Sequence, residues 1–158
     1  MAADKKTIIV FSGDLDKAIA AFVIANGAAA MGDEVTMFFT FWGLNILRRV
    51  GAPPHPRTRL QALFGRMMPG SSRALGLSKM HFAGLGPRLM RRVMRSQGVA
   101  SLEELMASAK EQGVRMIACT MSMDVLGFRP EDLIDGLEFA GVATYLGAAD
   151  EANVNLFI

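Results

Sequence analysis

The sequence predicts an α/β protein built on a parallel β-sheet that helices cover on both faces. Segments rich in β-branched and aromatic residues alternate along the chain with helical segments, which is the order of β-α-β units. The expected strands are apolar runs rather than alternating apolar and polar residues, as is typical of buried parallel strands. The chain has 158 residues, of which 51% are hydrophobic. One domain spanning residues 1–158 is therefore expected.

The first expected strand runs from Thr7 to Phe11 and ends at the turn Ser12-Gly13-Asp14. Ser12 and Asp14 can cap the helix that follows, which is predicted from Asp14 to Met31 and ends before Gly32. A second strand is expected from Val35 to Phe41 and is followed by Trp42. Ligands bind at the carboxyl ends of strands in open α/β sheets. The Ser12-Gly13-Asp14 turn and Trp42 are therefore predicted to line a binding pocket, with packing in the core as the alternative for Trp42.

A basic segment follows the second strand. Between Val35 and Leu102 the chain holds eleven Arg and Lys residues and no Asp or Glu, although its net charge is only +2. Pro53, Pro54 and Pro56 open this segment, which we interpret as an inserted stretch of basic amphipathic helices at about 51–99. The apolar residues at helical spacing are Leu60, Leu63, Phe64, Met67 and Met68 in one helix, and Leu85, Leu89, Met90, Val93 and Met94 in the other.

Such helices suit three kinds of contact. They can lie on an anionic membrane surface through Arg88, Arg91, Arg92 and Arg95, dock an acidic partner, or form the interface of a homo-oligomer. The alternative is that the arginines form a solvated face while the Leu and Met residues complete the core. Nucleic acid is not expected as a partner, because the segment matches no recognised nucleic-acid-binding pattern.

The second half of the chain continues the alternation of helices and strands. Ser101 and Glu104 form a capping-box signature that starts a helix ending before Gly113. A further helix is expected to open at Phe128-Arg129-Pro130-Glu131-Asp132, with proline in its first turn. A short strand at Leu137 to Phe139, a helix through Tyr145 to Ala149 and a strand at Val154 to Ile158 complete the expected fold.

The only cysteine of the chain, Cys119, follows the short apolar run Val114 to Ala118, which predicts a buried strand. A thiol at the end of that strand is expected to be accessible to reactants. Thr120, Ser122 or Asp124 can cap a following helix whose N–H groups favour a thiolate. The alternative is that Cys119 is an inert, buried, small apolar residue, as free cysteines often are.

Several classes of function are not expected. A single cysteine excludes an intramolecular disulfide framework, and no dinucleotide-binding or P-loop motif is present. His55 and His81 stand apart from cysteine and from acidic residues, so neither a metal site nor a cofactor is predicted. The start of the chain does not resemble a signal peptide, and no apolar stretch reaches the roughly 18 residues of a membrane span. We therefore expect a cytoplasmic protein, with the inner membrane surface as a peripheral contact.

Four stretches resemble the DsrE/DsrF-like family of small sulfur-transfer proteins, in the branch that carries a longer middle insertion and is often labelled peroxiredoxin-like. These stretches are Ser12 to Lys17, Phe38 to Leu44, Cys119 to Asp124, and Gly141 to Leu146 followed by Ala152-Asn153. The resemblance covers nearly the whole chain and is weakest in the basic insertion.

The resemblance implies a three-layer α/β/α fold with five parallel strands, oligomers, and a cysteine that carries sulfane sulfur as a persulfide. Cys119 matches that cysteine. Thr120, Ser122 and nearby backbone N–H groups can each hydrogen-bond the anionic persulfide, and which of them does so stays open. Whether the chain transfers sulfur to an acceptor or only holds it stays open. Peroxiredoxin chemistry is not expected, because no resolving cysteine exists within the chain. The alternative is a non-catalytic oligomeric module whose insertion binds an anionic surface or an acidic partner.

Overall fold

The sheet has five parallel strands, as predicted. The computed structural model describes residues 3–52 and 55–158, so Pro53 and Pro54 of the basic segment lie outside the described residues. The strand order is β4-β3-β2-β1-β5, and every pairing is parallel. The strands are β1 (Lys5–Val10), β2 (Glu34–Phe39), β3 (Arg115–Cys119), β4 (Glu138–Ala140) and β5 (Val154–Phe157).

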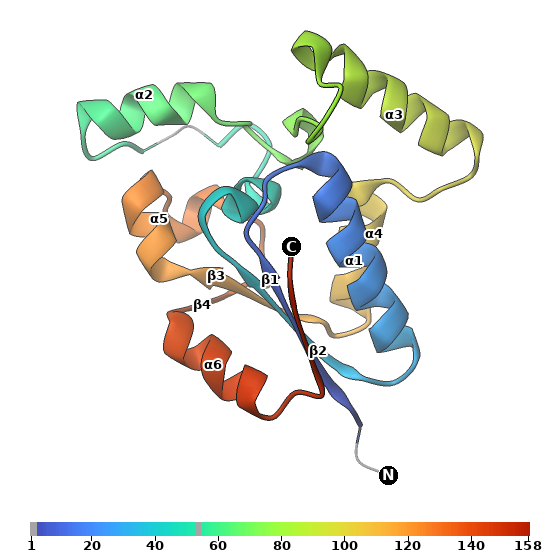
Figure 1. Cartoon of the computed structure of the whole chain (residues 1–158). Helices are drawn as coiled ribbons and strands as arrows, with labels where there is room; N and C mark the ends of the chain where they lie inside the picture. The colour runs from blue at the N-terminus through green and yellow to red at the C-terminus, as the bar shows by residue number, and fades with distance from the viewer. Residues whose placement is uncertain (1–2, 53–54) are drawn as a thin grey trace.

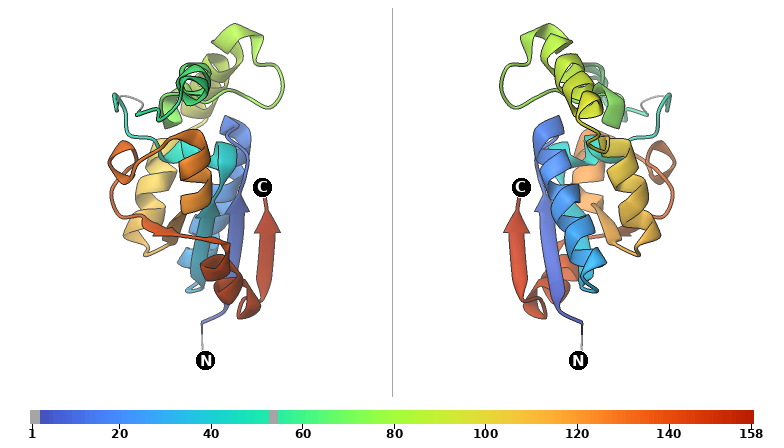
Figure 2. Two further views of the ribbon diagram at one scale, coloured as in Figure 1. Left: turned by 90° about the vertical axis from the view of Figure 1, so that its left-hand side faces the viewer. Right: turned by 90° about the vertical axis from the view of Figure 1, so that its right-hand side faces the viewer.

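Helices lie on both faces of this sheet, which gives the three layers of the predicted α/β/α fold (Figures 1 and 2). On one face α1 and α4 pack against each other, and on the other face α6 contacts β1 and β4. The α-helices are α1 (Leu15–Ala30), α2 (Arg59–Met67), α3 (Leu85–Ser96), α4 (Leu102–Glu111), α5 (Thr120–Leu126) and α6 (Val142–Asp150). Short 3₁₀ helices are η1 (Phe41–Leu47), η2 (Ser72–Ala74), η3 (Phe82–Gly84) and η4 (Pro130–Asp132).

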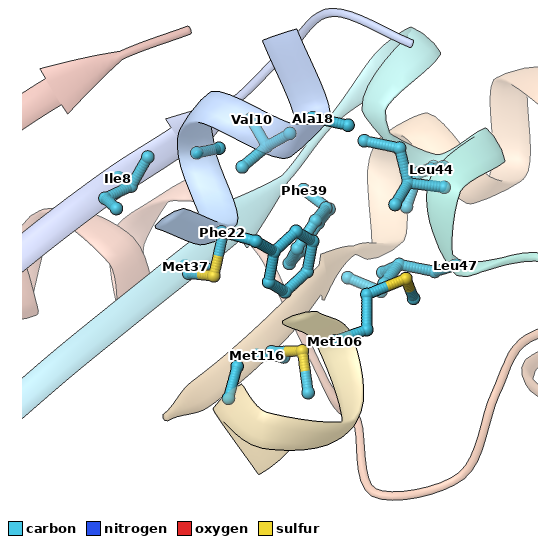
Figure 3. Packing of buried hydrophobic residues seen from close by; sticks show 14 of the residues in the cluster. Ile8, Val10, Ala18, Phe22, Met37, Phe39, Leu44, Leu47, Met106 and Met116 are labelled. Carbon is cyan, nitrogen blue, oxygen red and sulfur yellow. The ribbon is translucent and has the colours of Figure 1, made fainter. Parts of the chain in front are cut away.

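The main core lies between the sheet and the α1–α4 layer. Alternate strand residues such as Met37, Phe39 and Met116 point toward these helices, and Figure 3 shows Phe22 of α1 among them. The rings of Phe22 and Phe39 lie 6.0 Å apart. Full burial of each large apolar side chain contributes roughly 1.5–3 kcal/mol, so this cluster fixes the positions of the strand ends.

The basic segment lies over the carboxyl ends of the strands, with α2 and α3 at the end of the molecule opposite the N-terminus (Figure 1). Several contacts tie it to the sheet layers, and two of them involve α1 and α4. Asp16 of α1 accepts a hydrogen bond from the Ser78 N–H at 3.0 Å, and Arg91 of α3 forms an ion pair with Glu103 of α4 at 3.2 Å. Arg91 therefore points toward the body of the protein, unlike the other arginines expected to contact a membrane.

The apolar stripes of α2 and α3 face solvent. Neither helix buries a large apolar side chain: Leu63 of α2 is 56% exposed and Leu89 of α3 is 54% exposed. The alternative in which these residues complete the core is therefore wrong for most of both stripes, although Met68, at the end of the first, packs against the main core. The residues that remain more than 40% exposed are Leu60, Leu63, Phe64, Met67, Leu85, Leu89, Met90 and Val93.

Most predicted elements are present within a few residues, and the exceptions have local causes. The capping box at Ser101 and Glu104 is confirmed. The helix expected to open at Phe128 is only the single turn η4. It stops there because the next residue, Leu133, pairs antiparallel with Arg48 instead of continuing the helix. Among the described residues, no helix combines the length and the apolar character that crossing a bilayer requires.

Candidate functional site

The carboxyl ends of β1, β2 and β3 bring the predicted site residues to one edge of the sheet. Because the strands are adjacent and parallel, Val10 pairs with Phe39, and Phe39 with Ala118. The Ser12-Gly13-Asp14 turn, Trp42 and Cys119 follow directly. The structure nevertheless divides them between two places, because Cys119 and Trp42 do not line the same cavity.

Cys119 is the last residue of β3, and its side chain lies on the α6 face of the sheet. It packs there with Phe38 of β2, Ile117 of β3 and Tyr145 of α6 in a buried cluster separate from the main core. Only 3% of Cys119 is exposed. The expectation of an accessible thiol at the strand end is therefore not met in this structure. β3 ends at Cys119, as predicted, but α6 covers that residue.

The capping expected after Cys119 is also wrong. Cys119 itself occupies the N-cap position of α5, and no side chain caps that helix. Thr120, Ser122 and Asp124 cannot serve as caps, because the chain enters the helix immediately at the strand end without an intervening turn. A side chain within a helix cannot accept the hydrogen bonds from the first N–H groups of that helix, as the side chain of an N-cap residue does.

Thr120 and Ser122 have different surroundings. Thr120 is exposed at the start of α5, while Ser122 is completely buried. The Ser122 hydroxyl forms a hydrogen bond with the Thr40 hydroxyl at 2.8 Å and so joins α5 to the end of β2. This partner already satisfies the Ser122 hydroxyl, which argues for a structural contribution from that side chain.

Tyr145 is the residue that sequence reasoning missed. Its ring lies 5.3 Å from the ring of Phe38, and it belongs to the same cluster as Cys119. Its hydroxyl hydrogen-bonds Thr7 Oγ1 at 3.3 Å, and the Thr7 hydroxyl in turn donates to Asn155 of β5. Tyr145 is the only buried residue of α6. The available signal was a single tyrosine, the only one in the chain, within a helix of small residues.

The other predicted site residues share a cavity of about 700 Å³. Ser12, Gly13, Asp14 and Trp42 all line it, together with residues of the basic segment that include Phe64, Met67 and His81. Trp42 is 42% exposed, so it lies at the cavity rather than in the core, as the pocket interpretation predicts. Cys119 is not among the residues that line this cavity.

The polar groups of the Ser12-Gly13-Asp14 turn mostly bind one another. The Asp14 N–H donates to Ser12 Oγ at 3.1 Å, and the Ser12 hydroxyl donates to the Asp14 carboxylate at 3.0 Å. That carboxylate also pairs with Lys17 at 3.1 Å. Asp14 occupies the N-cap position of α1 but makes no side-chain cap bond, so the capping expected of Ser12 and Asp14 is wrong.

Gly13 has a packing requirement of its own. A Cβ atom at this position would lie 2.7 Å from the carbonyl oxygen of Trp42, closer than such atoms approach in proteins. Glycine therefore lets the turn after β1 approach η1 and hold Trp42 at the cavity wall. Phe41, directly before Trp42, adopts a φ of 46°, an uncommon conformation for a bulky residue.

The two histidines lie in different environments. His55 Nδ1 lies 2.8 Å from a carboxylate oxygen of the buried Asp132, whereas His81 lines the cavity beside Trp42. Within residues 3–52 and 55–158, no three His, Cys, Asp or Glu side chains are grouped so that they could hold a metal ion.

Comparison with known proteins connects this arrangement to a family. The profile of the DsrE/DsrF/DrsH-like family matches residues 3–157. The chain is 51% identical to YrkE of Bacillus subtilis (strain 168) over 154 residues, which cover 98% of this chain and 96% of that protein. It is also 37% identical over 164 residues, and the full length of both chains, to a protein of Allochromatium vinosum named sulfur carrier protein DsrE2.

Solved structures share the fold at much lower identity. The YchN protein of E. coli superimposes with a TM-score of 0.61 at 11% identity, covering 98% of this chain and 99% of that one. The MTH1491 protein of Methanobacterium thermoautotrophicum gives a TM-score of 0.58 at 13% identity, covering 97% and 98% of the two chains. These likenesses support the three-layer fold.

Proposed function

The chain belongs to the DsrE/DsrF/DrsH-like family, and on that premise we propose that it holds sulfane sulfur as a persulfide on Cys119 and passes it to an acceptor thiol. The observation that carries this proposal is the position of the only cysteine at the carboxyl end of an inner strand of the sheet. The name of the Allochromatium relative, a sulfur carrier similar over its full length, supports a role in sulfur transfer.

The proposed reaction needs no redox partner. The Cys119 thiolate attacks the outer sulfur of a donor persulfide, forming Cys119–S–SH, and the donor leaves as a thiolate. An acceptor thiolate then attacks the outer sulfur, and the Cys119 thiolate is the leaving group. Each step exchanges one thiolate for another, so the rates depend on thiolate fraction and access. Thr120 directly follows Cys119, and we propose that its exposed hydroxyl contacts the persulfide. Ser122 helps to position α5 through its hydrogen bond with Thr40.

Access requires α6 to move. Cys119 is only 3% exposed, so neither donor nor acceptor reaches its thiol in this conformation. The helix above it buries only Tyr145, and an element with so few buried contacts opens locally at low free energy. We propose that Cys119 is loaded from such an open state. The cavity lined by Ser12, Gly13, Asp14 and Trp42 is our candidate for the surface that receives the donor or the acceptor.

Sulfur uptake tests the proposal directly. Incubating the reduced protein with polysulfide or thiosulfate should add sulfur to Cys119, visible as an increase in intact mass that dithiothreitol reverses. The Cys119→Ser variant should remain unmodified. If the native protein takes up no sulfur and its thiol reacts with iodoacetamide only after denaturation, Cys119 is an inert core residue and the proposal is wrong.

A second candidate function concerns the basic segment. We propose that this insertion of about 51–99 in a single domain docks the otherwise cytoplasmic protein on the anionic inner membrane surface. The specific observation is that the apolar stripes of α2 and α3 point outward beside exposed Arg88, Arg92 and Arg95. Assembly into a homo-oligomer is the competing use of the same apolar surface, and an acidic protein partner is the third.

A further inference from the structure

A second cavity, of about 500 Å³, lies on the α4 side of the sheet. It is bounded by the end of η1, by α4 and by the stretch around Asp135, whose carbonyl accepts a hydrogen bond from Lys110 of α4 at 3.1 Å. Its volume lies within the range of small-molecule sites, which are mostly apolar with a few placed polar groups. The apolar part of the lining consists of Ile46, Val50, Met106, Met116 and Ile134.

The charged residues around this cavity carry a surplus of positive charge. Arg48, Arg49, Arg73 and Lys110 line it, against only two acids, Glu103 and Asp135. Both acids already have partners. Glu103 accepts from the Ser72 hydroxyl at 2.9 Å and from Arg91 at 3.2 Å, and Asp135 pairs with Arg49 at 2.8 Å. The ion pairs found within the described part of the chain do not include Arg73.

Arg48 provides an independent observation. It is only 5% exposed, and its guanidinium donates to the carbonyl oxygen of Pro69 at 2.8 Å and lies over the Phe128 ring at 5.0 Å. Its buried Nε has no hydrogen-bond partner among the described residues. Burial lowers the pKa of Arg48, and nearby Asp132 opposes that change, but a guanidinium stays charged in proteins. Arg48 therefore adds one more positive charge to this wall of the cavity, with Asp132 as the nearby acid.

We propose that this cavity binds a small organic anion with an apolar body, such as a medium-chain carboxylate. The head group lies between Arg73 and Lys110, and the hydrocarbon covers Met106, Met116 and Ile134. Charge alone does not explain the apolar lining, and an apolar ligand alone does not explain the surplus of cations over acids. The site is separate from sulfur chemistry, because Met116 and Cys119 pack in clusters on opposite faces of the sheet.

Calorimetric titration of the full chain with decanoate tests this site. We expect saturable binding of one decanoate per chain and an increase in the thermal midpoint. Acetate, which has the head group alone, and decyltrimethylammonium, which reverses the charge, should bind at least about tenfold more weakly. Equal binding of acetate would show a simple oxyanion site, and equal binding of the cation would show a purely apolar one. Either result, or no decanoate binding, overturns the proposal.

Variants locate the binding. Arg73→Gln and Lys110→Gln change exposed side chains, and each should weaken decanoate binding about tenfold or more. Val50→Glu places a negative charge at a 63% exposed lining position and should weaken binding in the same way. Arg92→Gln, which removes an exposed arginine of α3 outside the cavity, should leave it unchanged. If the three cavity variants bind normally while Leu63→Ser on α2 does not, decanoate binds the outward helix stripe and the assignment is wrong.

Discussion

At the scale of single residues, the burial of Cys119 involves Tyr145. A strand-end thiol is open to solvent only if nothing lies over it, and here an aromatic ring does. The ring is held from two sides, by Phe38 beneath it and by the hydrogen bond from its hydroxyl to Thr7. Because Thr7 already donates to Asn155, the Tyr145 hydroxyl is the donor in this pair. The hydroxyl of Tyr145 is thus held by a single hydrogen bond, which one substitution removes.

Tyr145→Phe should make Cys119 more reactive without unfolding the protein. The substitution keeps the ring and loses one hydrogen bond, whose net contribution is about 0.5–1.5 kcal/mol. Iodoacetamide labelling under native conditions, followed by intact mass, should accelerate about two- to tenfold.

Ser101→Ala is the matched control for that measurement. It removes a helix cap on the other face of the sheet, at a cost of about 1 kcal/mol in global stability. It should leave native-state labelling nearly unchanged if α6 opens locally. Labelling rates that follow the global unfolding free energy in both variants would contradict a local opening.

At the scale of elements, periodicity predicts a helix but not its neighbours. The spacing of Leu60, Leu63 and Phe64 indicated an amphipathic helix, and α2 is present. Nothing in that spacing tells whether the stripe meets a core or solvent, because the answer depends on elements distant in sequence. The same limit applies to Cys119. The apolar run before it predicted β3, whereas its burial comes from Tyr145 in a later helix.

Local signals were reliable where one short stretch determines the geometry. Ser101 and Glu104 satisfy each other within one turn, so the capping box could be read from spacing alone. After Cys119 the chain has three polar residues in cap-compatible positions, but the boundary between β3 and α5 falls before all of them. Sequence patterns locate such boundaries only to within a few residues, and a shift of the boundary by one residue is enough to remove a cap.

The outward stripes of α2 and α3 predict binding to vesicles that contain acidic lipids. Each Arg near an anionic surface contributes on the order of 1 kcal/mol. Replacing Arg88, Arg92 and Arg95 by Gln should therefore lower the vesicle partition constant, measured by co-sedimentation, by about two orders of magnitude. Arg91 is left in place because it is paired with Glu103. Binding should also fall as salt rises, since the Debye length is about 8 Å at physiological ionic strength.

A triple variant outside the segment serves as the control for the vesicle experiment. Replacing Lys17, Lys110 and Arg129 by Gln changes net charge equally but leaves α3 intact. Binding that weakens equally in both triple variants would indicate a general charge effect. Absence of binding at low salt would leave the stripes for a subunit interface or an acidic protein partner.

At the scale of the whole molecule, acid should destabilise the fold through its ion-paired and hydrogen-bonded carboxylates. The hydrogen bonds from Arg115 lower the pKa of Glu138 below its usual value. Partial burial alone would raise the pKa of Asp16, but hydrogen bonds from Ser78 outweigh it and lower that pKa. A carboxyl group whose pKa is lower in the folded state stabilises the protein above its unfolded pKa. That contribution is lost as the pH falls through the folded value.

The denaturant midpoint should therefore stay level from neutral pH down to about 5 and fall below about 4, where these carboxylates are protonated. Asp16→Asn should flatten part of this acid slope, because it removes one titrating group that ties α1 to the basic segment. A midpoint that falls mainly between pH 6 and 7 would assign the dependence to a histidine instead.

The exposed apolar residues on the α6 side predict that the chain assembles with copies of itself. Val142 and Leu146 of α6 are 59% and 51% exposed, and Phe157 of the edge strand β5 is 68% exposed. Monomers rarely leave contiguous apolar patches larger than a few hundred Å², and unpaired edge strands invite pairing. Light scattering at micromolar concentration should report an oligomer.

The position of the interface can be found with two charge insertions. Leu146→Glu should dissociate the oligomer if copies meet over α6, whereas Leu63→Glu should do so if they meet through the stripe of α2. We expect the first result, because Val142 and Leu146 of α6 are exposed and α6 packs on β1 and β4 on this side. A neighbouring copy there would also hold α6 over Cys119, so the monomeric Leu146→Glu variant should label faster with iodoacetamide. A wild-type protein that is monomeric at this concentration, or a Leu146→Glu variant that stays assembled, would contradict this arrangement.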